Sequence, residues 1–171
     1  MLDVAFAIPG DLNAATGGYA YARKLFALLP EFGIQPHHLE LPGAFPAAST
    51  DDLALTRQLL DQLHPTTPVL FDGLAYGALP PGFLQGLQSS YIALVHHPLA
   101  YETGLTPTHQ RQFLISERYT LSRATAVIAT SPLTARELAA RYDVAPDLIT
   151  VAEPGTEPAV RAIGTDAGPN K

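Results

Sequence analysis

Residues 13–29 read NAATGGYAYARKLFALL, and this stretch decides which fold the chain is expected to adopt. Gly17 and Gly18 stand where a loop turns into a helix, and the apolar residues after them recur at a spacing that predicts one apolar helical face. The preceding residues 2–8 read as a buried strand that a Pro-Gly pair closes. A strand, a glycine loop and a helix in this order direct backbone N–H groups and a positive helix end at an anion. The alternative is that the two glycines only relieve crowding between the helix and a sheet.

The remainder of the chain alternates between apolar runs and helical patterns. Because the apolar runs are continuous, they predict a mainly parallel sheet covered on both faces. Pro36 indicates that the second strand lies at an edge of this sheet. The expected fold class is therefore α/β, a Rossmann-like three-layer α/β/α sandwich. Further strands are expected at residues 34–41, 69–71, 91–95, 126–129 and 149–151. One further helix is expected to begin at a cap, Ser49 or Thr50, and to end at His64. The other helices are expected at residues 81–88, 107–122 and 131–142.

The composition is that of one soluble globular domain, with 47% hydrophobic and 15% charged residues among 171. The net charge is −6 and no run of Lys or Arg occurs, so nucleic acid is not expected as a partner. The lack of cysteine excludes disulfides and thiolate zinc sites. Neither a secretory signal nor an apolar stretch near the ~20 residues of a membrane span is found. A cytoplasmic protein is expected, and the alternative is a protein that lies peripherally at the inner face of the membrane.

Polar residues gather at the carboxyl ends of the expected strands, which share one edge of a parallel sheet and are where such sheets bind ligands. Known nucleotide signatures are missing, since no G-x-G-x-x-G opens the first helix and no Walker lysine occurs. This weighs against a Rossmann-like enzyme that uses its own dinucleotide. The residues at the strand ends are Pro9-Gly10, Asp72-Gly73, His96-His97 and Thr130-Ser131.

Each of these polar residues has a structural and a functional interpretation. Successive side chains on a strand point to opposite faces, so His96 and His97 are not expected to share a metal ion, and one of them is expected to pack. Asp72 either accepts N–H bonds in its own turn or faces the cleft. Glu102 follows in a loop, and loops often carry function. Ser131 reads as a helix N-cap that a proline follows.

Four segments of the chain read TGGYAYARKL, VHHPLAYETGL, ATAVIATSPLTARELAARYDVAPDLITV and AEPGTEP. Together they resemble the N-terminal half of family 4, or group 1, glycosyltransferases, whose GT-B fold faces two Rossmann-like domains toward each other. The resemblance covers residues 1–157, and its closing strand, helix and Pro-Gly segment is the most specific part.

The resemblance implies retaining transfer of a sugar from a nucleotide-sugar donor to an unidentified acceptor. It implies no catalytic metal and no cofactor besides the nucleotide sugar as co-substrate. In such enzymes the glycine loop, here Gly17 and Gly18, approaches the donor diphosphate. A histidine after the central strand lies near the transferred sugar, and His96 matches that position best, with His97 second.

The same resemblance implies a division of labour between two domains. The N-terminal half usually holds the acceptor, so Asp72, Glu102 and Ser131 become acceptor-side candidates. Residues 1–157 are expected to form this half, and residues 158–171 read as a linker or disordered tail. The C-terminal donor-binding domain is absent from the sequence, so the fragment alone is expected to be inactive. The alternative function is a non-catalytic α/β binding or regulatory module.

Overall fold

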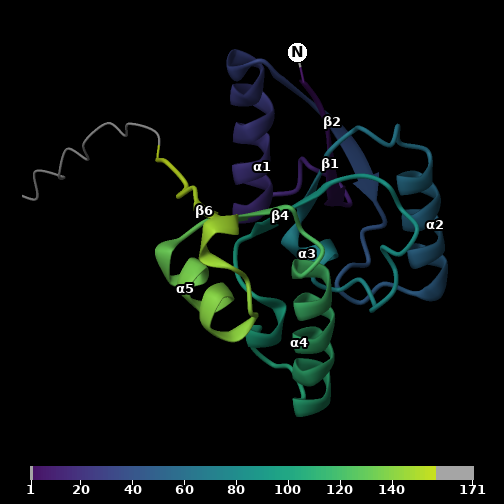
Figure 1. Ribbon diagram of the computed structural model, residues 1–171, viewed down its shortest axis with the longest axis vertical. Helices are drawn as coiled ribbons and strands as arrows, with labels where there is room; N and C mark the ends of the chain where they lie inside the picture. Colours follow the sequence, from purple (N-terminus) through teal and green to yellow (C-terminus); the bar gives the residue numbers. More distant parts are fainter. Residues whose placement is uncertain (1, 157–171) are drawn as a thin grey trace, which may run out of the picture.

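The computed structural model describes residues 2–156, and their centre is a single parallel sheet (Figure 1). Its six strands lie in the order β2-β1-β3-β4-β5-β6, and every neighbouring pair is parallel. The expected α/β, Rossmann-like fold is thereby confirmed. The strands are β1 (Leu2–Pro9), β2 (Ile34–Leu41), β3 (Val69–Asp72), β4 (Tyr91–Val95), β5 (Ala126–Ala129) and β6 (Ile149–Val151). The proposed tail, residues 158–171, lies outside the described residues.

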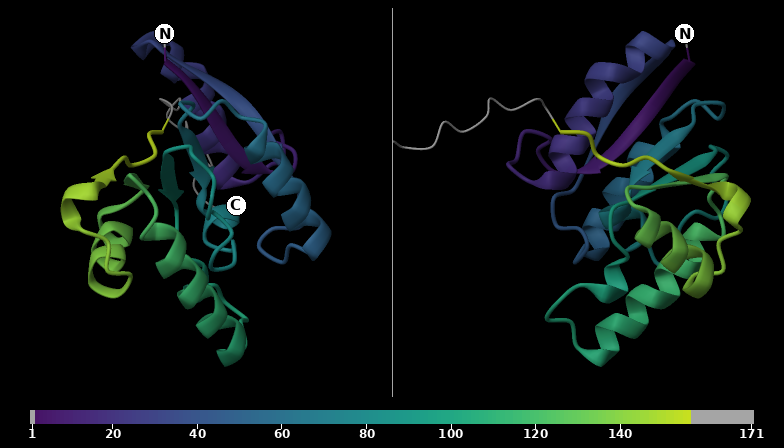
Figure 2. Two further views of the ribbon diagram at one scale, coloured as in Figure 1. Left: turned by 45° about the vertical axis from the view of Figure 1, so that its right-hand side comes forward. Right: turned by 90° about the vertical axis from the view of Figure 1, so that its left-hand side faces the viewer.

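Helices cover the two faces of the sheet unequally. One apolar cluster joins α1 to β1 through Ala22 and Phe6, whereas the larger cluster on the other face takes in residues of α2, α3, α4 and α5. In the side views α4 projects well beyond the sheet, and the segment after β6 passes beside α1 (Figure 2). The helices are α1 (Gly17–Leu28), α2 (Thr50–Asp61), α3 (Gly73–Tyr76), α4 (Pro107–Leu121) and α5 (Pro132–Arg141), with short 3-10 turns η1 (Leu29–Phe32), η2 (Leu99–Tyr101) and η3 (Pro146–Leu148).

Local signals in the sequence explain most element boundaries. Ser49 caps α2, because its hydroxyl accepts the N–H of Asp52 at 3.2 Å while the Asp52 carboxylate accepts the N–H of Ser49 at 2.8 Å. Ser131 caps α5, as expected, since its hydroxyl accepts the N–H of Thr134 at 3.0 Å. Pro36 lies in β2, which is an edge strand. No helix within residues 2–156 is both long and apolar enough to cross a bilayer.

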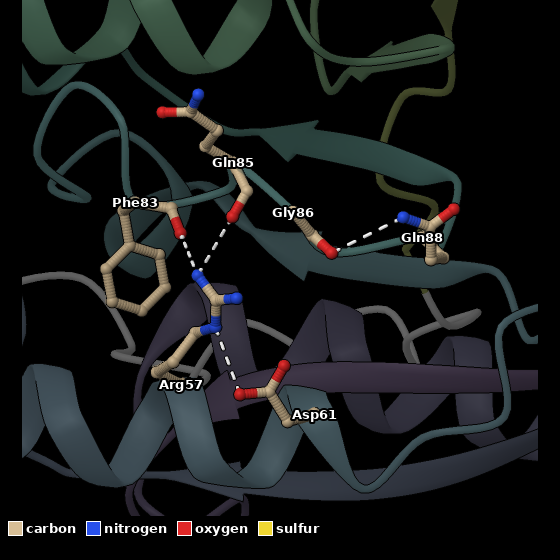
Figure 3. Close-up of polar contacts among 6 residues, drawn as sticks. All are labelled: Arg57, Asp61, Phe83, Gln85, Gly86 and Gln88. Carbon is tan, nitrogen blue, oxygen red and sulfur yellow. Dashed lines mark hydrogen bonds and ion pairs between the residues drawn. The ribbon is translucent and has the colours of Figure 1, made fainter.

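The helix expected at residues 81–88 is wrong, because these residues form turns. Gly82 and Gly86 adopt φ angles of +89° and +83°, which a right-handed helix does not allow. Arg57 of α2 holds the segment instead (Figure 3). Its Nη1 donates to the carbonyl oxygens of Phe83 at 3.0 Å and Gln85 at 3.1 Å. Its Nε donates to the carboxylate of Asp61 at 3.1 Å on the same helix.

Arg57→Lys tests how much this guanidinium contributes to stability. The substitution keeps the charge, but an ammonium cannot bond in the same fork to Asp61 and to two loop carbonyls. We expect the free energy of unfolding in urea to fall by about 1 kcal/mol. The exposed Arg136 on α5 provides the matched control, Arg136→Lys, for which we expect a change below about 0.5 kcal/mol. Equal effects of the two substitutions would contradict the role given to Arg57.

Candidate functional site

A cavity of about 420 Å³ opens at the carboxyl ends of β3 and β4, beside the N-terminus of α1. We call it the strand-end cavity. The strands β2 and β3 lie on opposite sides of β1, and the cavity lies at this point of the sheet. Such a point is the usual ligand position in an open parallel sheet. Five of the candidate residues meet at this edge, because the cavity is lined by Gly18, Asp72, His96, His97 and Glu102.

Two of the candidate residues lie outside the strand-end cavity. Gly17 lines a neighbouring cavity of about 340 Å³, between α1 and residues 153–155. Ser131 lines neither cavity, and its hydroxyl accepts the N–H of Thr134 at 3.0 Å as the cap of α5. The same helix start reaches the site through Thr134, whose hydroxyl donates to the carbonyl oxygen of His96 at 3.1 Å.

His96 is held by packing and leaves one polar atom without a partner. The edge of its ring meets the ring of Tyr21 at a centroid distance of 5.4 Å. Its Nε2 is buried and has no hydrogen-bond partner among residues 2–156. Burial lowers the pKa of His96, and the nearby Asp72 opposes this only in part. The imidazole is therefore neutral at pH 7, with a free Nε2 beside the cavity.

Asp72 satisfies both interpretations that the sequence left open. Its side chain accepts the N–H of Leu74 at 2.9 Å and so caps α3, while the residue also lines the strand-end cavity. Asp72 is only 4% exposed, and burial raises the pKa of its carboxyl group, against the opposing effects of the Leu74 N–H and of His96. A buried acid and a half-buried base thus line one cavity at adjacent strand ends.

Crowding does not account for Gly17 and Gly18. A Cβ at Gly17 would have no neighbour within 4 Å, and one at Gly18 would lie 3.6 Å from Nε2 of His96, an ordinary contact. Neither glycine has a positive φ. Packing demands glycine instead at Gly73, where a Cβ would lie 2.8 Å from the carbonyl oxygen of Leu94. The space over Gly17 is therefore open at the start of α1, whereas the imidazole of His96 lies against Gly18.

The start of α1 also offers N–H groups. The N–H of Tyr19 is taken by the Thr16 hydroxyl at 3.2 Å and that of Ala20 by the Thr16 carbonyl at 3.0 Å. The N–H groups of Gly17 and Gly18 precede these, and a helix supplies no internal partner to its first residues. Within residues 2–156, no three side chains of a type that binds metal gather as they would around an ion.

The sequence model of Glycosyltransferase Family 4 matches residues 21–160, which is most of the chain. The chain belongs to this family. The match begins after Gly17 and Gly18, so the assignment does not depend on the glycine loop. No curated protein matches the chain.

Sequence reasoning missed two tyrosines that brace this family 4 domain around its cavity. The Tyr19 hydroxyl donates to the carbonyl oxygen of Pro9 at 2.6 Å and so ties α1 to the end of β1. The Tyr21 hydroxyl donates to the carbonyl oxygen of Ala152 at 2.9 Å, just beyond β6. Both residues fit the apolar face of α1, so their spacing gave no sign of these polar contacts.

Glu117 is the most consequential residue that the sequence did not reveal. This carboxylate of α4 is 4% exposed and accepts the N–H of Leu99 at 2.6 Å and of Ala100 at 3.2 Å. It therefore fixes η2, which lies in the chain between His97 and Glu102. Burial raises the pKa of Glu117 to about 7, although both N–H bonds and His97 lower it. In sequence, Glu117 resembles any charged residue on an exposed helix.

The raised pKa of Glu117 predicts a pH-dependent stability. Because the folded pKa of about 7 exceeds the ordinary value of 4.5, the contribution of this group is most favourable below pH 4.5 and is lost as the pH rises through 7. At 1.36 kcal/mol per pKa unit, the loss is about 3 kcal/mol. Glu117→Gln removes this titrating carboxyl group. The difference in urea unfolding free energy between variant and wild type should therefore change by about 3 kcal/mol between pH 4.5 and a pH above 7.

Glu31→Gln is the matched control for the Glu117 experiment, because the exposed Glu31 stays in water in both states. Its unfolding free energy should follow that of the wild type across the same pH range. If Glu117→Gln also follows the wild type, Glu117 does not titrate in the folded domain as its burial requires.

Proposed function

We propose that this family 4 domain is the acceptor-side half of a retaining glycosyltransferase. In the proposed reaction the bond between the anomeric carbon of the sugar and the diphosphate of a nucleotide sugar breaks. A bond from the same carbon to the oxygen of an acceptor hydroxyl forms, the nucleoside diphosphate leaves, and the proton of that hydroxyl passes to the departing diphosphate or to water. The nucleotide sugar is the co-substrate, and the proposal includes no metal and no further cofactor.

One observation carries this proposal, namely the buried and unpartnered Nε2 of His96 beside Gly18 at the start of α1. A buried polar atom without a partner is costly in a folded protein, and His96, which carries this atom, lines the strand-end cavity, where a ligand could supply the partner. A neutral imidazole suits a sugar hydroxyl, because it can donate or accept a hydrogen bond. In the proposal His96 therefore contacts the transferred sugar, and His97 is the second candidate for this contact.

The start of α1 is proposed to receive the donor diphosphate. Its Gly17 and Gly18 N–H groups and the positive helix end attract an anion, and this attraction contributes roughly 0.3–1 kcal/mol at an exposed site and ~2 kcal/mol when partly buried. The open space over Gly17 lets a phosphate approach the backbone, and Gly18 has no side chain that would stand between this space and His96. Support from the glycines would be modest alone, so a C-terminal domain that holds the rest of the donor is part of the proposal.

The acceptor is proposed to lie on the opposite side of the transferred sugar. Asp72 and Glu102 line the strand-end cavity there, and their carboxylates can accept hydrogen bonds from acceptor hydroxyls. Asp72 is buried and partly used by Leu74, whereas Glu102 is exposed. Ser131 is not retained as an acceptor contact, because its hydroxyl caps α5 away from the cavity.

His96→Ala in the full-length protein tests the catalytic assignment. We expect kcat to fall about tenfold or more, the equivalent of one hydrogen bond to a polarised group, with little change in melting temperature. His37→Ala is the control, because His37 pairs with Asp3 at 2.9 Å on the edge strand β2. Loss of kcat only in His97→Ala would move the role to the neighbouring histidine. Effects confined to melting temperature would favour a non-catalytic binding module.

Gly18→Val tests the diphosphate assignment in the same protein. A valine would stand between the α1 N–H groups and the donor, so the donor KM should rise or kcat should fall while the melting temperature changes little. Ala27→Val, at an exposed position of the same helix that lines neither cavity, controls for the lower helix propensity of valine and should leave the donor kinetics unchanged. Normal donor kinetics in a folded Gly17→Val, Gly18→Val double variant would contradict this assignment.

A further inference from the structure

Two further cavities continue from the strand-end cavity along α4 and α5. The first has a volume of about 330 Å³ and shares His97 with the strand-end cavity. The second, at about 670 Å³, shares Tyr101 and Arg141 with the first. A path of adjoining hollows therefore leads from the proposed reaction centre, past His97 and Tyr101, to the surface between α4 and α5.

The outermost hollow concentrates positive charge in a chain whose net charge is −6. Three arginines line it, Arg111 and Arg118 from α4 and Arg141 from α5, and no carboxylate is among its lining residues. We call these three residues with Tyr101 the arginine pocket. Three guanidinium groups beside one aromatic ring are suited to a ligand that carries an oxyanion.

Two of the three arginines are held in place by the protein. Arg118 donates from Nε and Nη2 to the carbonyl oxygen of Arg141 at 2.9 and 2.6 Å, which leaves most of its N–H donors unused. The guanidinium of Arg141 lies 5.7 Å from the ring centre of Tyr101. Two carboxylates stand nearby, with Glu137 at 3.0 Å from Arg141 and Asp143 at 3.9 Å from Arg118. These contacts orient the guanidinium groups before a ligand arrives, which lowers the entropic cost of binding.

Arg111 differs from its two neighbours. It is exposed and makes no hydrogen bond or ion pair with the described part of the chain. Its whole guanidinium fork is therefore available for bidentate contact with a phosphate or carboxylate. An unpaired arginine thus lines the same cavity as two oriented ones, an arrangement that surface salt bridges alone do not require.

We propose that the acceptor carries an oxyanion, a phosphate or carboxylate, which the arginine pocket binds while an acceptor hydroxyl reaches the strand-end cavity. This inference rests on the proposed function, because it names the substrate class of that same site. The donor diphosphate is assigned to the start of α1, and no residue of α1 lines either outer cavity. The arginine pocket is therefore left for the acceptor, and both a soluble sugar phosphate and a lipid headgroup carry an anionic group of this kind.

Binding of matched neutral and anionic probes to the 171-residue chain tests the proposal. Glucose and glucose 6-phosphate are titrated at constant ionic strength while amide chemical shifts are followed by NMR. Glucose 6-phosphate should bind about tenfold more tightly or better, as expected of charge-assisted hydrogen bonds, and should shift the amides of Tyr101 and Arg111. A parallel arm compares phosphatidylcholine vesicles with and without phosphatidylglycerol, which separates a lipid source of the anion from a soluble one.

Arg111→Gln should weaken the binding of the anionic probe about tenfold, because the substitution removes an unpaired guanidinium without breaking an internal contact. The control is Arg136→Gln, which makes the same change in net charge at an exposed position of α5 that lines none of the three cavities. Arg111-dependent binding of either the sugar phosphate or the anionic vesicles supports the proposal. Equal effects of the two substitutions, or no preference for the anionic probes, overturns it.

The outcome is separable from the fate of the proposed function. His96→Ala should leave oxyanion binding unchanged, because His96 lines neither outer cavity. A chain that binds the anion but whose full-length form transfers no sugar would refute the reaction while keeping the pocket. Transfer to an uncharged acceptor that is insensitive to Arg111→Gln would keep the reaction and refute the pocket.

Discussion

All strands of the described sheet run in the same direction, and each part of the candidate site depends on that constraint. Parallel strands end at one edge, so residues far apart in sequence, such as Asp72 and His96, become neighbours without any local motif. The helix that follows β1 then starts at the same edge and brings Gly18 to His96. In an antiparallel arrangement, alternate strand ends would lie at opposite edges and these groups could not meet.

The strands and most helices could be predicted because their signals are local. Apolar runs mark buried strands, and Ser49 and Ser131 are caps whose partners lie three residues away. Residues 81–88 were mispredicted because two glycines there take left-handed angles and Arg57, distant in sequence, supplies the bonds. Ser131 caps α5 and lines no part of the strand-end cavity, and in sequence a cap and a ligand contact look alike.

Glu117 shows why the rest of the site could not be predicted. Nothing in the pattern of α4 distinguishes it from an exposed glutamate, and its role appears only when η2 presents two N–H groups to it. A buried carboxylate costs free energy unless such donors compensate it. The position of Glu117 also requires glycine at residue 77, because a Cβ on Gly77 would lie 2.7 Å from Cγ of Glu117. Membership of Glycosyltransferase Family 4 gives this architecture its chemical setting, whereas the acceptor must be inferred from the cavities themselves.

Tyr21 connects two places that otherwise have little in common. Its ring braces the imidazole of His96, and its hydroxyl holds the carbonyl oxygen of Ala152, where the chain leaves the sheet. One side chain therefore contacts both the imidazole that lines the strand-end cavity and the backbone just beyond β6. A displacement of Ala152 would remove the acceptor of the Tyr21 hydroxyl or would move the ring that packs against His96. The orientation of His96 is thus coupled to the position of the backbone at Ala152.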